Sequence, residues 1–258
     1  MKRNILFRIL YFVLIAVFLI SVFNLGRIYY GYHKVDTVYH ALQEEFISPQ
    51  KPTPIPEEGE TKETASASGE IPFSVDFPAL LEKNGDVIGW LYCPETVIHY
   101  PVVQGKTNDD YLRRDLDGKY LVGGTLFADS RNDDLGEDAN FVIYGHNMDD
   151  GSMFQPLVKY KDQAYYDANP VMYYLTPYGN YRLELFAGLV VRRDDPIYKI
   201  TKTSAEFQNL LKEYKEKSTF TSSVEWTEGD MIVTLSTCSY EYNHARYIVM
   251  GKLVPIHE

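Results

Sequence analysis

The chain reads PYGNYRLELFA from residue 177 to residue 187. The first four residues favour a tight turn, and after them apolar and polar side chains alternate, which is typical of a strand with one buried face. Outward from this hairpin, further runs of branched and aromatic residues show the same character. We therefore predict strands at 86–93, 97–103, 124–128, 140–145, 171–176, 181–191, 230–237 and 246–255.

Helical patterns are few and short between these strands. Asp76 can cap a helix that buries Leu80 and Leu81 and stops at Asn84-Gly85. A later helix, at 203–217, begins with a capping box of Thr203 and Glu206, and its apolar face consists of Phe207, Leu210, Leu211 and Tyr214. A mainly β chain with eight short strands and few helices favours a closed or nearly closed β-barrel, because closure removes exposed sheet edges.

The composition excludes some classes of function. The 258 residues are 45% hydrophobic and 24% charged, which suits a globular protein with one main domain. The formal net charge of -11 argues against a nucleic-acid-binding protein, which needs a basic face. The two cysteines, Cys93 and Cys238, are too few for a disulfide framework, so one of them is free to carry chemistry.

The N-terminus indicates a membrane anchor. Residues 9–23 are apolar apart from Ser21, and Ile5 to Phe7 extend the run to about the 20 residues that cross a bilayer. Three basic residues precede the span and one follows it closely, which places the N-terminus in the cytoplasm and the rest of the chain outside. A cleaved signal peptide is the alternative, but residues 22–26 offer no small-x-small cleavage site.

This pattern divides the chain into three parts, namely a cytoplasmic start and transmembrane anchor at 1–27, a helical stalk and flexible linker at 28–70, and the folded domain at 71–258. Apolar residues recur at helical spacing from Ile28 to Phe46, so the span continues as an amphipathic helix, either a stalk or a cap on the domain. The proline-rich and polar run at 48–70 cannot bury enough apolar surface to order itself. We therefore expect a chain that starts near Ile71 to fold alone.

Three side chains that can carry chemistry lie at predicted strand ends. Cys238 follows the strand 230–237, His146 follows the strand 140–145, and Arg246 begins the last strand. Taken singly, these residue types are more often a small buried side chain, a hydrogen-bonded loop histidine and a solvent-facing charge. On neighbouring strands, they would present a thiol, an imidazole and a guanidinium at one rim. A cysteine nucleophile needs such groups to protonate the leaving amine and to hold the oxyanion.

The same stretches resemble the motifs of a known family. Thr234-Leu235-Ser236-Thr237-Cys238, with Arg246 on the next strand, is similar to the active-site signature of sortases. Asn140-Phe141-Val142-Ile143-Tyr144-Gly145-His146 resembles their histidine motif. The resemblance runs from about Asp86 to Leu253 and fits class B best. It implies an eight-stranded sortase-type β-barrel with N-terminal helices, one late helix between barrel strands, and no cofactor or metal.

The resemblance implies a membrane-anchored cysteine transpeptidase outside the cell. Its substrates would be surface proteins with a C-terminal sorting motif of the Leu-Pro-x-Thr-Gly or Asn-Pro-x-Thr kind. Cys238 would attack the threonine carbonyl, His146 would protonate the departing amine, and an amine of peptidoglycan or of a pilin-type subunit would accept the acyl group. Arg246, with the backbone N–H of Ser239, would hold the oxyanion. By position, the residues that would line the substrate groove are Asn108, Leu112, Ile197, Tyr198 and Ser236.

The other reactive side chains have structural interpretations. Cys93 matches no catalytic motif and is expected in the core. His99 is expected to be a core or rim histidine with its hydrogen bonds satisfied. Ser239 stands where some class B members carry an acidic residue. An acidic cluster consists of Asp129, Asp133, Asp134, Glu137 and Asp138. It lacks the ligand order of an EF-hand loop, so we expect a solvated loop rather than a calcium site.

One other exported cysteine enzyme is excluded by the sequence, and two alternative functions remain open. An L,D-transpeptidase would carry His and Gly just before its cysteine, where this chain has Ser236-Thr237. An exported cysteine peptidase would hydrolyse the same acyl enzyme with water. A non-catalytic, membrane-tethered binding module would bury Cys238 and protect it from alkylation.

Overall fold

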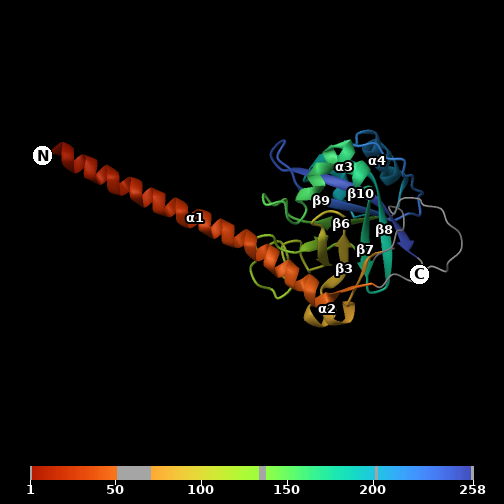
Figure 1. Cartoon of the computed structure of the whole chain (residues 1–258). Coiled ribbons are helices and arrows are strands. Elements are labelled where there is room, and N and C mark those ends of the chain that lie inside the picture. Colours follow the sequence, from red (N-terminus) through yellow and green to blue (C-terminus); the bar gives the residue numbers. More distant parts are fainter. Residues whose placement is uncertain (1, 51–70, 134–137, 201–202, 257–258) are drawn as a thin grey trace, which may run out of the picture.

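The fold is a closed eight-stranded β-barrel at the end of one long helix (Figure 1). The computed structural model describes residues 2–50, 71–133, 138–200 and 203–256. The barrel strands are β3 (Val87–Tyr92), β4 (His99–Val103), β5 (Leu126–Ala128), β6 (Asn140–Tyr144), β7 (Val171–Thr176), β8 (Gly179–Arg192), β9 (Ile232–Cys238) and β10 (Ala245–Ile256). Each predicted strand is confirmed to within two residues at either end.

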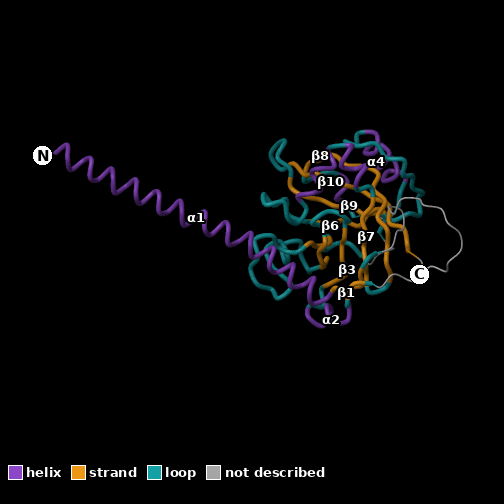
Figure 2. The backbone as a smooth tube through the Cα atoms, viewed as in Figure 1, coloured by secondary structure: helices purple, strands orange, loops and turns teal. Residues whose placement is uncertain are grey.

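The order of strands around the barrel is β10-β8-β7-β3-β4-β5-β6-β9. Six of the eight neighbouring pairs are antiparallel, whereas β4 pairs with β5 and β6 pairs with β9 in parallel. A parallel pair needs a crossover connection. The crossover from β6 to β9 contains β7, β8 and most of the other helices, namely η1 (Gln155–Lys161), α3 (Gln163–Ala168), η2 (Pro196–Tyr198) and α4 (Ala205–Glu216). Figure 2 shows α4 on the side of the barrel opposite α2, with loops over much of the remaining surface.

The helix α1 (Lys2–Phe46) is continuous from the apolar N-terminal segment to the barrel. Its first half extends away from the barrel (Figure 1), and its second half packs on it. The buried side chains Val35, Tyr39, Leu42 and Phe46 follow the helical spacing of one face and belong to the main hydrophobic core. Of the two expected roles of this helix, residues 35–46 therefore have that of a cap packed on the domain rather than that of a free stalk.

A small two-stranded sheet joins α1 to the barrel. β1 (Ile47–Pro49) pairs with β2 (Phe73–Val75), and the Asp76 N–H donates to the Phe46 carbonyl at 2.9 Å. Part of the expected flexible linker is thus paired strand at Ser48 and Pro49, while its residues 51–70 lie outside the described residues. We propose that the folded domain begins near residue 31 rather than at Ile71.

The predicted N-cap is confirmed for the first of the two predicted helices and is wrong for the second. Asp76 caps α2 (Phe77–Lys83) by accepting from the Ala79 N–H at 3.1 Å, as predicted. In α4, the capping residue is Ser204, which accepts from the Phe207 N–H at 3.2 Å, so the predicted box of Thr203 and Glu206 is wrong by one position. With Ser204 at the cap, an apolar residue stands three positions later and no reciprocal acidic bond can form.

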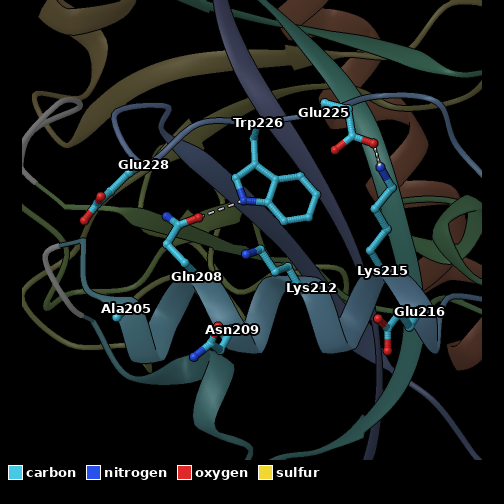
Figure 3. Close-up of a pocket in the computed structure, with 9 residues that line it drawn as sticks. All are labelled: Ala205, Gln208, Asn209, Lys212, Lys215, Glu216, Glu225, Trp226 and Glu228. Carbon is cyan, nitrogen blue, oxygen red and sulfur yellow. Dashed lines mark hydrogen bonds and ion pairs between the residues drawn. The ribbon is translucent and has the colours of Figure 1, made fainter.

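The segment 224–228 covers one side of α4 (Figure 3). The indole of Trp226 donates to the Gln208 carboxamide at 2.9 Å and stacks on Phe186 with ring centroids 4.5 Å apart. Lys215 reaches the carboxylate of Glu225 and lies over the indole, 5.5 Å from the ring centroid. The indole of Trp226 therefore contacts both the barrel strand β8 and the helix α4, and it holds α4 against the barrel.

The core position expected for Cys93 and the satisfied core or rim position expected for His99 are both confirmed. Cys93 is fully buried, its Sγ lies 3.8 Å from the hydroxyl of Tyr160, and burial raises the pKa of its thiol. His99 accepts at Nδ1 from the Trp90 indole at 3.0 Å, and burial lowers its pKa to about 4. Neither side chain reaches the ends of β6 and β9.

We predict that removing residues 1–70 will destabilise the protein, whereas removing residues 1–30 will not. The longer cut removes Val35, Tyr39, Leu42 and Phe46, each of which stabilises the fold by about 1.5–3 kcal/mol through burial. Their combined contribution is comparable to the whole stability of a typical domain, so a large loss of cooperative unfolding is expected. Thermal and urea unfolding of the two shortened proteins measures the difference. Equal midpoints would show that α1 is dispensable for folding.

Candidate active site

The parallel pairing of β6 with β9 places the predicted histidine beside the predicted cysteine. Tyr144 lies opposite Ser236 in the register, and the Gly145 N–H donates to the Ser236 carbonyl at 3.1 Å. The hydroxyl of Thr237 then donates to the Gly145 carbonyl at 2.8 Å. His146 therefore emerges next to the end of β9. A Cβ at Gly145 would lie 2.5 Å from Leu126, so only glycine fits at this turn.

The hairpin between β9 and β10 places the predicted arginine directly opposite the cysteine. Arg246 and Cys238 are partners in the antiparallel register. The Ser239 N–H donates to the Ala245 carbonyl at 3.1 Å and closes this end of the hairpin. The expected use of that N–H for an oxyanion is therefore not supported, because the donor is already engaged. Of the two expected oxyanion donors, Arg246 remains available.

The three side chains border one cleft of about 510 Å³. Its lining consists of Asn108, Asp109, Leu112, Phe127, Arg131, Tyr144, Gly145, His146, Arg193, Tyr198, Ser236, Thr237, Cys238 and Arg246. Cys238 is half-buried and unpaired with another cysteine, in contrast to the fully buried Cys93. The Asn147 side chain donates to the Cys238 carbonyl at 2.9 Å, which fixes the strand end on which the thiol stands. A thiol held in this way is both rigid and reachable.

Four of the five expected substrate-groove residues line this cleft. They are Asn108, Leu112, Tyr198 and Ser236, whereas the side chain of Ile197 is fully buried in a second core cluster and does not line it. The hydroxyls of Tyr198 and Ser236 are 2.8 Å apart, and burial raises the pKa of Tyr198. This tyrosine therefore stays protonated and can donate a hydrogen bond at neutral pH.

The ring of His146 is oriented by a backbone carbonyl. Its Nε2 lies 2.8 Å from the Leu112 oxygen. A carbonyl oxygen can only accept, so Nε2 carries a proton there and Nδ1 is the nitrogen left for the cleft. Burial lowers the pKa of His146, Arg113 lowers it further, and the bond to Leu112 opposes this shift. The protonated form is thus a minor species near neutral pH.

An ion pair between the exposed guanidinium of Arg131 and the buried carboxylate of Asp129 borders the cleft, and the sequence patterns do not predict it. Arg131 binds both oxygens of Asp129, at 2.8 and 2.7 Å, and donates to the Tyr198 carbonyl at 3.0 Å. Tyr144 donates to the same carboxylate at 2.9 Å and stacks on Tyr198. Burial alone would raise the pKa of Asp129, but its hydrogen bonds to Arg131 and Tyr144 hold it low. The pair thus fixes two aromatic walls of the cleft.

The interpretation of the acidic cluster as a solvated loop is wrong for two of its members. Asp129 and Asp138 are buried, and Asp138 accepts from the Asn132 side chain at 3.0 Å and from the Asp133 N–H at 2.7 Å. Positions 134 and 137 lie outside the described residues. The spacing of Asp129 and Arg131 just after a predicted strand was the available signal, because such a pair can form a bidentate bond.

An acidic residue does follow the cysteine, two positions later than Ser239. Glu241 accepts from the Ser239 hydroxyl and pairs with Lys161 of η1. Burial would raise the pKa of Glu241, but the bonds from Lys161 and Ser239 lower it to about 2. These contacts tie the loop after Cys238 to η1.

A separate hollow of about 680 Å³ lies on α4, between Ala205 and the segment 224–228 (Figure 3). Its lining includes Gln208, Lys212 and Trp226 but none of the three candidate catalytic residues. The chemistry expected from the sequence therefore belongs to the cleft at the ends of β6, β9 and β10.

Comparison with known proteins agrees with this geometry. The family model of the Sortase domain matches residues 91–254. The sortase B of Listeria monocytogenes is 37% identical over 196 residues, which cover 74% of this chain and 78% of that protein. A Bacillus anthracis structure described as similar to sortase B has a TM-score of 0.69 at 32% identity and covers 88% of this chain and 98% of its own. A Staphylococcus aureus sortase B–substrate complex has a TM-score of 0.66 at 33% identity and covers 70% and 85%.

We predict that His146 titrates below its ordinary pKa of about 6.5 in the folded protein. The unfolded chain then binds the proton more readily, so the stability contributed by neutral His146 is present above about pH 6.5 and is lost as the pH falls toward the folded value. The measurement is the NMR titration of the His146 ring in a Cys238→Ala protein, which avoids coupling to the thiol. The midpoint should return to about 6.5 in urea. A folded midpoint at or above that value would contradict the burial argument.

Proposed function

Because the chain belongs to the sortase family of cysteine transpeptidases, we propose that Cys238, His146 and Arg246 carry a transpeptidation of the class B type. The observation that supports this most strongly is their convergence. Three residues from separate stretches of sequence border one cleft, and two of them stand directly opposite each other in the strand register.

The first half of the reaction forms a thioester. The thiolate of Cys238 attacks the carbonyl carbon of the threonine in the sorting motif, and the carbonyl oxygen becomes an oxyanion. The amide bond then breaks, and the protonated ring of His146 gives its proton to the departing amine. Since Nε2 is held by Leu112, the proton leaves from Nδ1.

The second half reverses these roles. An amine of peptidoglycan or of another protein subunit attacks the thioester carbon, neutral His146 accepts the proton released by that amine, and the thiolate of Cys238 departs. The acyl group then forms a new amide. A peptidase would differ only in using water, so transfer depends on an amine that competes well for the acyl enzyme.

Arg246 supplies the positive charge for the oxyanion in both halves. It faces the same cleft as Cys238, and its Nη1 donates to the Ala245 carbonyl at 3.0 Å, which leaves other N–H donors of the guanidinium for substrate. Asn108, Leu112, Tyr198 and Ser236 would hold the sorting motif along the cleft. A relative of the same fold has been solved as a substrate complex, which supports a substrate-binding role for proteins of this fold.

The N-terminal half of α1 anchors the enzyme in the membrane. It contains a segment long and apolar enough to cross a bilayer, and none of that window is buried within the protein. The basic residues before the span orient the N-terminus toward the cytoplasm and the barrel toward the cell exterior.

The function is tested by incubating the protein with a library of sorting-motif peptides and an excess of amine. Mass spectrometry should find threonine-terminated acyl groups on Cys238 and amide products with the amine. Hydrolysed peptide alone, at every amine concentration, would favour the peptidase alternative. Absence of any adduct, with Cys238 resistant to alkylation, would favour a binding module.

We predict that the two cysteines differ completely in their effect on activity. Cys238→Ala should abolish peptide cleavage without loss of thermal stability, because the thiol is half-buried and is the nucleophile. Cys93→Ala should keep turnover and cost about 1 kcal/mol of unfolding free energy, because it only leaves a small cavity in the core. Turnover and unfolding are measured on both variants. Comparable activity in the two would remove Cys238 from the mechanism.

We predict that Arg246→Lys lowers kcat/KM for peptide cleavage by about 10²- to 10³-fold, or roughly 3–4 kcal/mol. Lysine keeps the charge but loses the planar fork of donors that can hold an oxyanion and a neighbouring group together. A solvent-facing strand end would instead change stability by less than about 0.5 kcal/mol and leave the rate unchanged. The test compares kcat/KM with thermal unfolding, and a near-normal rate would limit the catalytic set to Cys238 and His146.

A further inference from the structure

The outer end of the membrane span is marked on α1 by two exposed tyrosines. Tyr29 and Tyr30 are 74% and 68% exposed, and they follow the run of exposed apolar side chains that ends at Ile28. Tyrosine is enriched at the level of lipid headgroups, where its ring and its hydroxyl each find a suitable environment. From Leu10 to Ile28 the helix rises by about the 30 Å of a hydrocarbon core. The two rings therefore stand at the outer interface.

The barrel meets α1 within one turn of these tyrosines. Val122 packs over Gly31, where an added Cβ would lie 3.5 Å from its Cγ1. The Lys34 ammonium donates to the Tyr120 carbonyl at 2.8 Å. The hydroxyl of Tyr32 donates to Asp149 at 3.4 Å. Two loops of the barrel thus contact α1 immediately beyond the span, and the helix is unbroken between them and the membrane.

The helical rise sets the height of this contact. At 1.5 Å per residue, Gly31 and Lys34 lie about 2 and 6 Å beyond Tyr30 along the axis. The headgroup region on each side of a bilayer is roughly 5–8 Å thick. A tilt of the helix, which averages about 20° in membranes, brings one side of the barrel still closer. On the proposed anchoring by α1, the backbone at residues 120–122 therefore falls within the headgroup layer.

We infer that residues 119–122, here called the interfacial loop, form a docking surface for the lipid headgroups of the membrane that α1 spans. The inference rests on the proposed anchoring of α1. Tyr120 is 68% exposed although its carbonyl is fixed by Lys34, and the side chain of Lys119 is 69% exposed. The Lys119 ammonium pairs with the Asp117 carboxylate at 3.0 Å, and its exposed side can still meet a headgroup. A phenol beside such an ammonium suits the boundary between acyl chains and phosphates.

The interfacial loop also belongs to the connection that holds the catalytic histidine. The Leu121 N–H donates to the Arg113 carbonyl at 3.0 Å, one residue after the Leu112 oxygen that binds His146. On the other side of α1, Asp149 follows His146 by three residues, so their Cα atoms are within about 11 Å. Docking of the loop would therefore keep the cleft close to the bilayer surface.

The test places tryptophan probes in the full chain and reconstitutes it in phosphatidylcholine–phosphatidylglycerol vesicles. Tyr120→Trp and Lys119→Trp report on the interfacial loop, and Phe12→Trp reports on the span. Tyr178→Trp is the matched control, because Tyr178 is 96% exposed in the turn between β7 and β8, beside the end of β10. That end of β10 lies on the side of the barrel away from the N-terminus (Figure 1). Fluorescence is compared with that of the unsubstituted protein.

The expected result is loss of fluorescence at positions 119 and 120 with a nitroxide on the lipid headgroup, and none at 178. Position 12 should be quenched by bromine placed in the middle of the acyl chains. Quenching at 12 but not at 119 or 120 would overturn the docking surface and leave the anchoring intact. No quenching at 12 would overturn the proposed anchoring and the docking with it. Equal quenching at 120 and 178 would overturn the assigned orientation. Peptide cleavage in detergent confirms that each variant is folded.

Discussion

The parallel pairing of β6 with β9 is the constraint on which the cleft depends. It sets the two strand ends side by side, so that His146 and Cys238 leave the barrel at the same rim. The hairpin to β10 then sets Arg246 opposite Cys238 by register alone. Gly145 makes the turn at this rim possible. Beyond the last register pair of β6 and β9, the side chains of Thr237 and Asn147 form hydrogen bonds that link the two strand ends. The proposed catalytic geometry is thus a property of the sheet rather than of flexible loops.

Much of this could be read from the sequence because the signals are local. Alternation along residues 181–187 and similar runs gave all eight barrel strands, and the motifs around Cys238 and His146 identified the candidate site before any geometry was known. The order of strands could not be obtained in this way, because the β6–β9 pair joins residues about ninety positions apart and no local pattern encodes such a contact.

The features that the sequence did not predict also depend on short elements or on contacts that form only in the folded protein. β1 and β2 have three residues each, too few for a period to show. The position of Ile197 could not be resolved from that of its neighbour Tyr198, because in a short 3-10 turn adjacent residues can face the core and the cleft. The burial of Asp129 is not predictable from its acidic neighbours in the sequence, because its partners, Arg131 and Tyr144, reach the carboxylate only after folding. The N-cap of α4 is Ser204 rather than the predicted Thr203, a difference of one residue that sequence patterns do not resolve.

The unbroken course of α1 also makes this helix a spacer of fixed length. Its second half is part of the core, so the barrel cannot slide along it, and its first half is the proposed membrane anchor. The number of residues between the span and Gly31 therefore determines how far the cleft stands from the lipid surface, at about 1.5 Å per residue. An enzyme anchored in this way meets substrates within a thin layer above the membrane rather than throughout the surrounding solution. Substrates retained at the same membrane are therefore present at a raised effective concentration.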